Sequence, residues 1–328
     1  MDRRRFFALL GVPLLLPLKS VAQQVASIRR VGILLPAKIE DAEYPTLIKA
    51  FIDGMRQAGW TEGVNLRLDI RWSGGSVDGI AKNAAELAAL APEVIVTAGA
   101  TATGPLLQLT RNIPVVFTIV PDPVGAGFID SLARPGGNAT GVASFEYTIG
   151  GKWVDLLKEV LPHLKRVAVL RDPQTTAGIG QFQAVQSATT SAGLEIRPVN
   201  MHDATAIERE TSAFATSGGG GLIVTSSGLS VMHRDLIVSL AERFRLPAVY
   251  YAAAFARAGG LIAYGSDRKA EFRRAASYVD RILKGTRPEE IPTETPTKYE
   301  LVVNTKAAKM IGLNIPTSML ARADEVIE

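Results

Sequence analysis

The sequence contains no cysteine, only three histidines and few aromatic residues, which make up 6% of its 328 positions. Without cysteine, the chain can form no disulfide, no thiolate metal site, no cysteine nucleophile and no lipid anchor attached through sulfur. The histidines, His163, His202 and His233, are isolated from one another, and their spacing is not typical of a metal site. We therefore expect neither a metal ion nor another cofactor.

The first 22 residues predict an export signal. A basic start over residues 2–7 precedes an apolar run over residues 8–18, and small residues at Ser20 and Ala22 are typical of a cleavage site. The apolar run is well short of the about 20 residues that a membrane-spanning helix needs. The arginines before Phe6 also resemble a twin-arginine signal. These features predict a mature protein in the periplasm, without a lipid anchor.

The charge of the chain gives no sign of a nucleic-acid partner. Residues 1–22 hold four of the 36 basic and one of the 32 acidic side chains, so the mature chain has a net charge of +1. The densest basic stretch, residues 268–287, has Glu271 and Asp280 interleaved at helical spacing. A nucleic-acid interface would need a concentrated positive face, and this pattern instead indicates a solvated helix surface.

From Arg29 onward, short apolar strands alternate with amphipathic helices, which is typical of parallel sheets covered by helices. The length suits two domains of roughly 100–200 residues each. The first half predicts strands at 30–35, 65–72, 94–97 and 115–120, and helices at 47–59 and 77–90.

The pattern of the first half then restarts. Residues 165–170 resemble residues 29–34, and two later segments repeat the comparison in the same order and at similar offsets. Those later pairs are 222–225 with 94–97, and 246–250 with 113–117. One such echo means little, but three in order predict two structurally equivalent lobes.

The end of the chain supplies a further helix, near 268–284, and a further strand, near 301–304. These extra elements complete both lobes if the chain crosses between them near 143–151, 264–267 and 296–300. We therefore predict an α/β fold of two Rossmann-like lobes, joined by a three-strand hinge, with an interlobe ligand cleft. The expected N-terminal lobe is 29–143 plus 265–296, and the expected C-terminal lobe is 144–264 plus 297–328.

Six segments carry a family likeness across most of the mature chain: 122–125, 132–141, 258–265, 273–285, 296–304 and 320–328. They include Asp-Pro-Val-Gly, a Leu-Ala-Arg-Pro-Gly-Gly-Asn-Ala-Thr-Gly stretch and the final Leu-Ala-Arg-Ala-Asp-Glu-Val-Ile-Glu. In these segments the chain resembles a bacterial family of ABC-transporter substrate-binding proteins.

The resemblance implies a type I periplasmic-binding fold whose lobes close on a small-molecule ligand. It also implies two partners, an ABC permease in the inner membrane and the ATPase of that permease. Some members of the family are linked to tryptophan or tyrosine uptake. We expect a monomer, and a ligand-sensing module that signals to a membrane partner stays open as an alternative.

In open α/β sheets, ligands bind beyond the carboxyl ends of the strands. In the N-terminal lobe this rule selects Pro36, Ala37, Gly99, Ala100, Thr101 and Asp122, and Ser144 at the first crossing could offer its hydroxyl to the cleft. We expect a helix to begin after residues 99–101, with Thr103 as its N-cap and Pro105 in its first turn. The free N–H groups at the start of this helix suit a carboxylate. The alternative is a plain glycine-bearing turn without a ligand. Asp122 is expected either to bind a ligand ammonium or to fix its own turn before Pro123.

In the C-terminal lobe the same rule selects Asp172, Thr225, Ser226, Tyr250 and Tyr251. A tyrosine at a strand end can stack on an apolar ligand and still present its hydroxyl. Packing between the lobes is the alternative, and we expect one tyrosine of the pair to serve it. An amino acid or a related small organic acid is the expected ligand.

Nothing in the sequence predicts catalysis. There is no Gly-x-Ser-x-Gly motif, and none of the three histidines lies at a predicted strand end. His233, for example, falls within a helix predicted at 230–243. We therefore predict a binding protein and not an enzyme. A two-lobed enzyme with an interlobe active site stays open as a second alternative.

Overall fold

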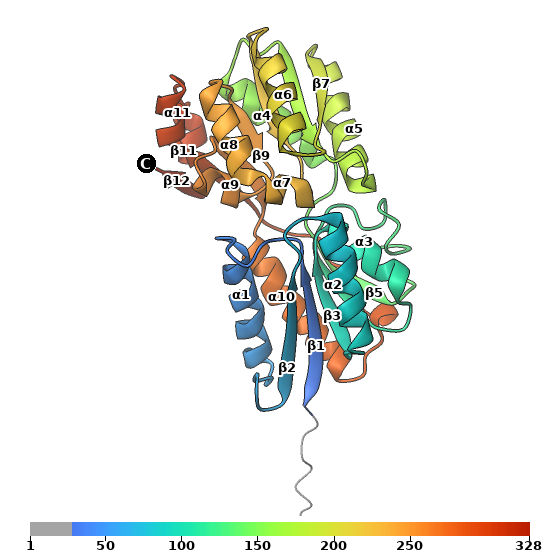
Figure 1. The fold of residues 1–328 in the computed structure, drawn as a ribbon. Coiled ribbons are helices and arrows are strands. Elements are labelled where there is room, and N and C mark those ends of the chain that lie inside the picture. The colour runs from blue at the N-terminus through green and yellow to red at the C-terminus, as the bar shows by residue number, and fades with distance from the viewer. Residues whose placement is uncertain (1–27) are drawn as a thin grey trace, which may run out of the picture.

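The computed structural model describes residues 28–328, so the export signal predicted at residues 1–22 lies outside the described part of the chain. Within that part, two β-sheets form two lobes that lie one above the other (Figure 1). We call the lobe with the five-stranded sheet the N-terminal lobe and the lobe with the seven-stranded sheet the C-terminal lobe.

The N-terminal lobe has an all-parallel sheet with helices on both faces. Its strands, in the order β2-β1-β3-β4-β5, are β1 (Arg29–Leu35), β2 (Leu66–Trp72), β3 (Val94–Ala98), β4 (Val115–Val120) and β5 (Ala139–Ala143). Its helices are α1 (Tyr44–Gln57), α2 (Val77–Ala89), α3 (Ala100–Leu109), α10 (Arg268–Leu283) and the 3-10 turn η1 (Pro288–Glu290).

The C-terminal lobe has the sheet order β12-β11-β10-β9-β8-β6-β7, in which β10 and β11 pair antiparallel. Its strands are β6 (Arg166–Arg171), β7 (Glu195–Asn200), β8 (Gly220–Val224), β9 (Ala248–Tyr250), β10 (Ile262–Ser266), β11 (Tyr299–Asn304) and β12 (Glu325–Ile327). Its helices are α4 (Ile149–Val160), α5 (Thr176–Ser191), α6 (Ala204–Ala215), α7 (Gly228–Met232), α8 (Arg234–Arg243), α9 (Ala253–Arg257), α11 (Thr305–Met310) and α12 (Thr317–Ala321).

The two sheets share one strand order. In each, the second strand lies outside the first, and the third, fourth and fifth follow on the other side, so β6, β8 and β9 correspond to β1, β3 and β4. These are the three pairs of segments whose sequences resemble each other. The predicted fold class, two Rossmann-like lobes joined by three chain segments, is confirmed.

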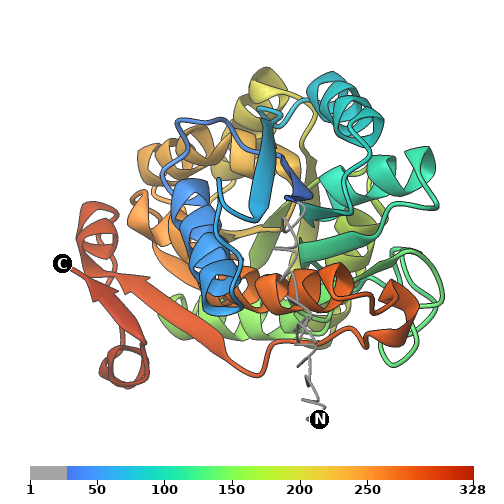
Figure 2. The ribbon, with the colours of Figure 1, turned by 90° about the horizontal axis from the view of Figure 1, so that it is seen from below.

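Helix α10 comes late in the chain but belongs to the N-terminal lobe, where it lies beside α1 (Figures 1 and 2). Phe272, Ala276 and Val279 of α10 are buried in one core cluster with Phe51 of α1. The helices approach closely because α1 has a glycine at the contact: a Cβ at Gly54 would lie 2.8 Å from the Cβ of Ala276. Figure 2 shows the C-terminal segment, in red, at one edge of the molecule.

Backbone hydrogen bonds hold the first and third connections side by side. The Ala143 N–H donates to the Glu294 carbonyl over 2.9 Å, and the Ser144 N–H donates to the Val120 carbonyl over 3.0 Å. Near the second connection, the indole N–H of the fully buried Trp153 donates to the Tyr264 carbonyl over 2.8 Å. These bonds tie the first connection to the third and to the end of β4, and they hold β10 against α4.

Three local predictions are wrong. Helix α3 begins at Ala100, not after Thr103, because Gly99 takes a φ of +80° and lets the chain turn directly into the helix, which leaves Pro105 inside it. The helix predicted at 230–243 is two helices that meet at His233. The chain end forms two short helices and the extra strand β12, where one short helix was expected.

None of the helices described over residues 28–328 is long and apolar enough to cross a membrane.

Candidate functional site

A cavity lies between the lobes, at the carboxyl ends of strands from both sheets. The space that its residues surround is about 360 Å³, part of it open to solvent, so the closed arrangement of the lobes leaves the cavity narrow. The residues that line it are Pro36, Tyr44, Gly99, Ala100, Thr101, Ile119, Pro121, Thr175, Ala177, Ser226, Ser227, Gly228, Val231, Tyr251 and Arg268. Strands β1, β3 and β4 lead into it from one lobe, and β8 and β9 lead into it from the other.

Half of the residues predicted from strand ends line this cavity: Pro36, Gly99, Ala100, Thr101, Ser226 and Tyr251. Thr101, in the first turn of α3, also bonds across the lobes, because its hydroxyl oxygen accepts the N–H of Gly228 over 3.1 Å. The N-terminus of α3 therefore faces the cavity. The N–H groups of Ala102 and Thr103 already bond to the Gly99 carbonyl, so those of Ala100 and Thr101 are the ones left without a partner in the helix.

The other half lie elsewhere, and three of them bond to backbone groups: Asp122 and Asp172 to their own turns, and Thr225 to a neighbouring strand. The Asp122 carboxylate accepts the Gly125 N–H over 2.9 Å, so it fixes its own turn, where its φ is +39°. The Asp172 carboxylate accepts the Gln174 N–H over 3.0 Å, and burial raises its pKa. Thr225 is fully buried and donates its hydroxyl to the Leu170 carbonyl over 2.8 Å.

The remaining three are Ala37, Ser144 and Tyr250. Ala37 lies beside a separate pocket that includes Lys38 and Met232. Ser144 is buried in the hinge. Tyr250 stacks on Phe255, with ring centroids 5.0 Å apart, and its hydroxyl has no hydrogen-bond partner among residues 28–328.

Tyr250 and Tyr251 differ in their surroundings because they are neighbours at the end of a strand. Successive side chains of a strand point to opposite sides of the sheet. Both rings are buried in the core cluster of the C-terminal lobe, but of the two only Tyr251, one residue after the end of β9, also lines the cavity. Of the pair, Tyr251 is therefore the candidate for contact with a ligand.

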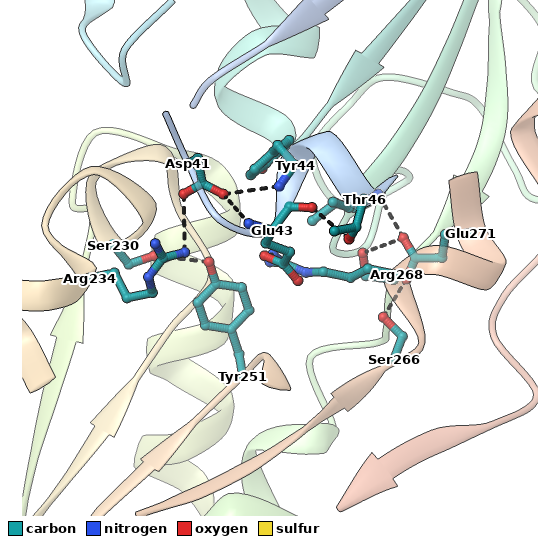
Figure 3. A network of polar contacts seen from close by, with 12 residues as sticks. Asp41, Glu43, Tyr44, Thr46, Ser230, Arg234, Tyr251, Ser266, Arg268 and Glu271 are labelled. Carbon is teal, nitrogen blue, oxygen red and sulfur yellow. Dashed lines mark hydrogen bonds and ion pairs between the residues drawn. The ribbon is translucent and has the colours of Figure 1, made fainter. Parts of the chain in front are cut away.

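Sequence reasoning missed Tyr44 and Arg268 in the cavity wall. Arg268 is the first residue of α10, directly after the second connection between the lobes, and that position is the signal that would have found it. Its side chain is 6% exposed, and its Nη1 lies 2.7 Å from Oε2 of Glu43 (Figure 3). Burial lowers the pKa of this guanidinium, but the charge of Glu43 and the nearby Tyr251 and Tyr44 outweigh burial and leave the pKa above its usual value.

Beside the cavity, a second ion pair lies between the two lobes, whereas that of Arg268 and Glu43 lies within the N-terminal lobe. Arg234 of α8 lies 3.1 Å from the carboxylate of Asp41, and both side chains are largely buried. Asp41 also accepts the N–H groups of Glu43 and Tyr44 at the start of α1 (Figure 3). With the bond between Thr101 and Gly228, this pair holds the lobes together in a closed arrangement.

The hinge contains a buried carboxyl group, Glu271 of α10, which is 3% exposed. It accepts hydrogen bonds from the Ile119 N–H over 2.9 Å, from the Ser144 hydroxyl over 3.3 Å and from the Ser266 hydroxyl (Figure 3). Burial raises the pKa of Glu271 to about 7, although these bonds and the charge of Arg268 act in the opposite direction. One side chain therefore ties β4 to two of the connections.

The Ile119 N–H that Glu271 binds belongs to a strained residue of the cavity wall. Ile119 has a φ of +55°, in the left-handed region that a β-branched residue rarely adopts, at a register shift between β4 and β5. Because Ile119 also lines the cavity, the hinge carboxyl and the cavity share one short segment of backbone.

The histidines lie apart from this arrangement. Among residues 28–328, no group of three or more His, Cys, Asp or Glu side chains is placed to hold a metal ion. His233 is partly buried at the junction of α7 and α8, and burial lowers its pKa.

Comparison with known proteins gives a consistent result. A family described as "ABC transporter substrate binding protein" matches residues 34–327. A protein named "Tyrosine-binding protein" from Clostridioides difficile (strain R20291) is 22% identical over 274 residues, which are 83% of this chain and 79% of that protein.

Two solved structures share the fold. A conserved domain protein from Vibrio cholerae has a TM-score of 0.85 and 24% identity, and the match covers 92% of this chain and all of that one. An ABC domain from Streptococcus pneumonia in complex with L-Trp has a TM-score of 0.84 and 23% identity over the same shares of the two chains.

Proposed function

This chain belongs to the family of ABC transporter substrate-binding proteins, and we propose that it captures an amino acid, or a related small organic acid, between its lobes. The family consists of binding proteins of transport systems, so the chain is not an enzyme. The single observation that carries the proposal is the interlobe cavity, because its wall combines backbone N–H groups at the start of α3 with the side chains of Tyr44 and Tyr251.

The chemistry of the wall suits an amino acid with an aromatic or apolar side chain. The start of α3 offers N–H groups and the positive end of its dipole to a carboxylate. Tyr44 and Tyr251, 1% and 2% exposed, offer ring surface to the rest of the solute. The names of two relatives, a tyrosine-binding protein and a domain in complex with L-Trp, support the same ligand class.

The proposed cycle follows from the two-lobed fold. An open form binds the solute, and a closed form makes contacts from both lobes at once, so the ligand shifts the population toward closure. The closed protein then delivers the solute to an ABC permease energised by its ATPase. We propose that the protein does this as a monomer in the periplasm, after export by the N-terminal signal.

The test begins with the solute itself. Mass spectrometry of small molecules that co-purify with the chain should detect an amino acid or organic acid. Calorimetric titration with L-tyrosine and L-tryptophan should then give saturable binding without turnover. A co-purified solute of another class, together with no binding of either amino acid, would contradict the ligand proposed here.

Filling the cavity should weaken that binding. Thr101→Trp places a large ring at the first turn of α3, where Thr101 lines the cavity. We expect affinity for L-tyrosine or L-tryptophan to fall by at least about tenfold, because one lost close hydrogen bond or contact of 1.4 kcal/mol is a factor of ten. Leu109→Trp, at the exposed end of the same helix, is the matched control and should bind as the wild type does. Equal affinities for both variants would place the ligand elsewhere.

A further inference from the structure

Arg268 is a buried cation in the cavity wall whose hydrogen bonds are incomplete, although Glu43 balances its charge. It stands at the start of α10, where the chain has just left β10 of the other lobe, and 7% of the residue is exposed. Such a position places one charge against both lobes. Figure 3 shows its side chain reaching toward the carboxylate of Glu43.

The contacts of this guanidinium leave one nitrogen unused. Nη1 pairs with Glu43 over 2.7 Å, and Cζ lies 5.0 Å from the ring centroid of Tyr251. Nη2 is buried and has no hydrogen-bond partner among residues 28–328. A guanidinium has five N–H donors and no acceptor. The Tyr251 hydroxyl is near enough to raise the pKa of Arg268, but it makes no hydrogen bond of normal geometry with Nη2, so an acceptor in the cavity could still satisfy this nitrogen.

The charges nearby do not supply that acceptor. Glu43 is engaged through Nη1, and Asp41 is engaged by Arg234 over 3.1 Å. The third carboxyl group, Glu271, accepts bonds from Ile119, Ser144 and Ser266. On the facing wall, the start of α3 contributes further partial positive charge. Within the cavity, an anionic group is therefore the complement that is missing.

We propose that Arg268 is the residue that selects a carboxylate, an inference that rests on the proposed function. The carboxylate of the solute accepts a hydrogen bond from Nη2 of Arg268. The same contact makes closure depend on the solute. In a closed cavity, a charged donor without a partner is costly, and a carboxylate removes that cost. An open form would expose the guanidinium to water, so the bond favours the closed state only when an anionic solute is present.

The experiment compares acids with their amides. Titrations with L-tyrosine and L-tyrosinamide, and with L-tryptophan and L-tryptophanamide, give the ratio of the two dissociation constants for each pair. Arg268→Gln keeps a donor toward Glu43 but removes the cation, and the double variant E43Q/R268Q removes both charges in case the single variant does not fold. Arg234→Gln is the matched control, because it removes an arginine that joins the lobes but does not line the cavity.

We expect the wild type to prefer each acid over its amide, and this preference to fall by about thirtyfold in Arg268→Gln, the effect of a hydrogen bond to a charged group. Arg234→Gln should weaken both members of a pair equally and so keep the ratio. A ratio in Arg268→Gln and in E43Q/R268Q that equals the wild-type ratio would overturn the role of Arg268 and leave the proposed function standing.

Acetate separates this inference from the proposed ligand class, because it is a bare carboxylate. We expect the midpoint of thermal unfolding to be higher in sodium acetate than in sodium chloride of equal ionic strength, for the wild type and Arg234→Gln but not for Arg268→Gln. If no amino acid binds the wild type, the ligand class fails, and this effect of acetate alone supports the anion site. If acetate has no effect on the wild type, or has the same effect on Arg268→Gln, the anion site is wrong.

Discussion

The wild type is expected to lose stability as the pH rises from below 4.5 to above 7, and the Glu271→Gln variant is expected to escape this loss. The free energy of unfolding of the wild type should fall by about 3 kcal/mol more than that of the variant over this range. The pKa of Glu271 is about 7 in the folded chain and has an ordinary value of 4.5. Between these values the folded state binds more protons than the unfolded state, so stability falls as the pH rises. Glutamine resembles the protonated acid and cannot ionise.

Urea unfolding at a series of pH values measures this effect. The groups that face Glu271 are the Arg268 cation, the hydroxyls of Ser144 and Ser266, and Tyr299, whose pKa is raised by burial and by the charges of Tyr264, Glu146 and Glu271. None of these groups titrates between pH 4.5 and 7, because the pKa of Tyr299 lies above its ordinary value of 10, so the difference between the two pH profiles belongs to Glu271. Glu62→Gln, at an exposed carboxyl, should reproduce the wild-type profile. Parallel profiles for wild type and Glu271→Gln would refute the prediction.

The second large effect is expected at Gly265, near the end of β10. A Cβ at this position would lie 1.9 Å from the carbonyl oxygen of Tyr251, which is a backbone atom and cannot move aside alone. Gly265→Ala should therefore destabilise the chain by about 3 kcal/mol, at the upper end of the usual effect of overpacking. Because the obstructed carbonyl belongs to a residue that lines the cavity, the affinity for the solute should also fall.

Denaturant unfolding and calorimetric titration of the same preparations test both parts. Gly137→Ala is the matched control, since a Cβ there meets nothing within 4 Å and its backbone is not in the left-handed region. Its stability should stay within about 0.5 kcal/mol of the wild type, as for most surface substitutions. If Gly265→Ala were as stable as Gly137→Ala, the close approach of the two segments would be disproved.

The fold was predictable because it depends on patterns that are local and repeated. Short apolar runs alternate with amphipathic helices, and the sequence around β6 restates the sequence around β1. The start of α3 was misplaced because the cap there is Gly99 with a positive φ, whereas the expected cap, Thr103, donates its hydroxyl back to the Gly99 carbonyl over 2.9 Å. The residue at which this helix begins is set by the backbone conformation of Gly99, which the residue types around it do not reveal.

The site was predictable only where strand ends decide it. Thr101 and Tyr251 follow strands and line the cavity. Which of the two neighbouring tyrosines, Tyr250 or Tyr251, faces the cavity depends on the residue at which β9 ends, because successive side chains point to opposite sides. Arg268 was not predictable from its surroundings in sequence, which are basic and acidic in turn and indicate a solvated helix surface. Its burial depends on Glu43, which is 225 positions away along the chain.

The place of α10 in the N-terminal lobe has a consequence for biosynthesis. When the ribosome has made all strands of the five-stranded sheet, the face of this sheet beside α1 still lacks α10. The chain then forms β6 to β10 of the seven-stranded sheet before α10 is synthesised. The core that joins Phe51 to Phe272 therefore closes late, through contacts between residues that are distant in sequence. Non-local contacts of this kind slow folding. A nascent chain that ends before residue 268 should remain a substrate for chaperones.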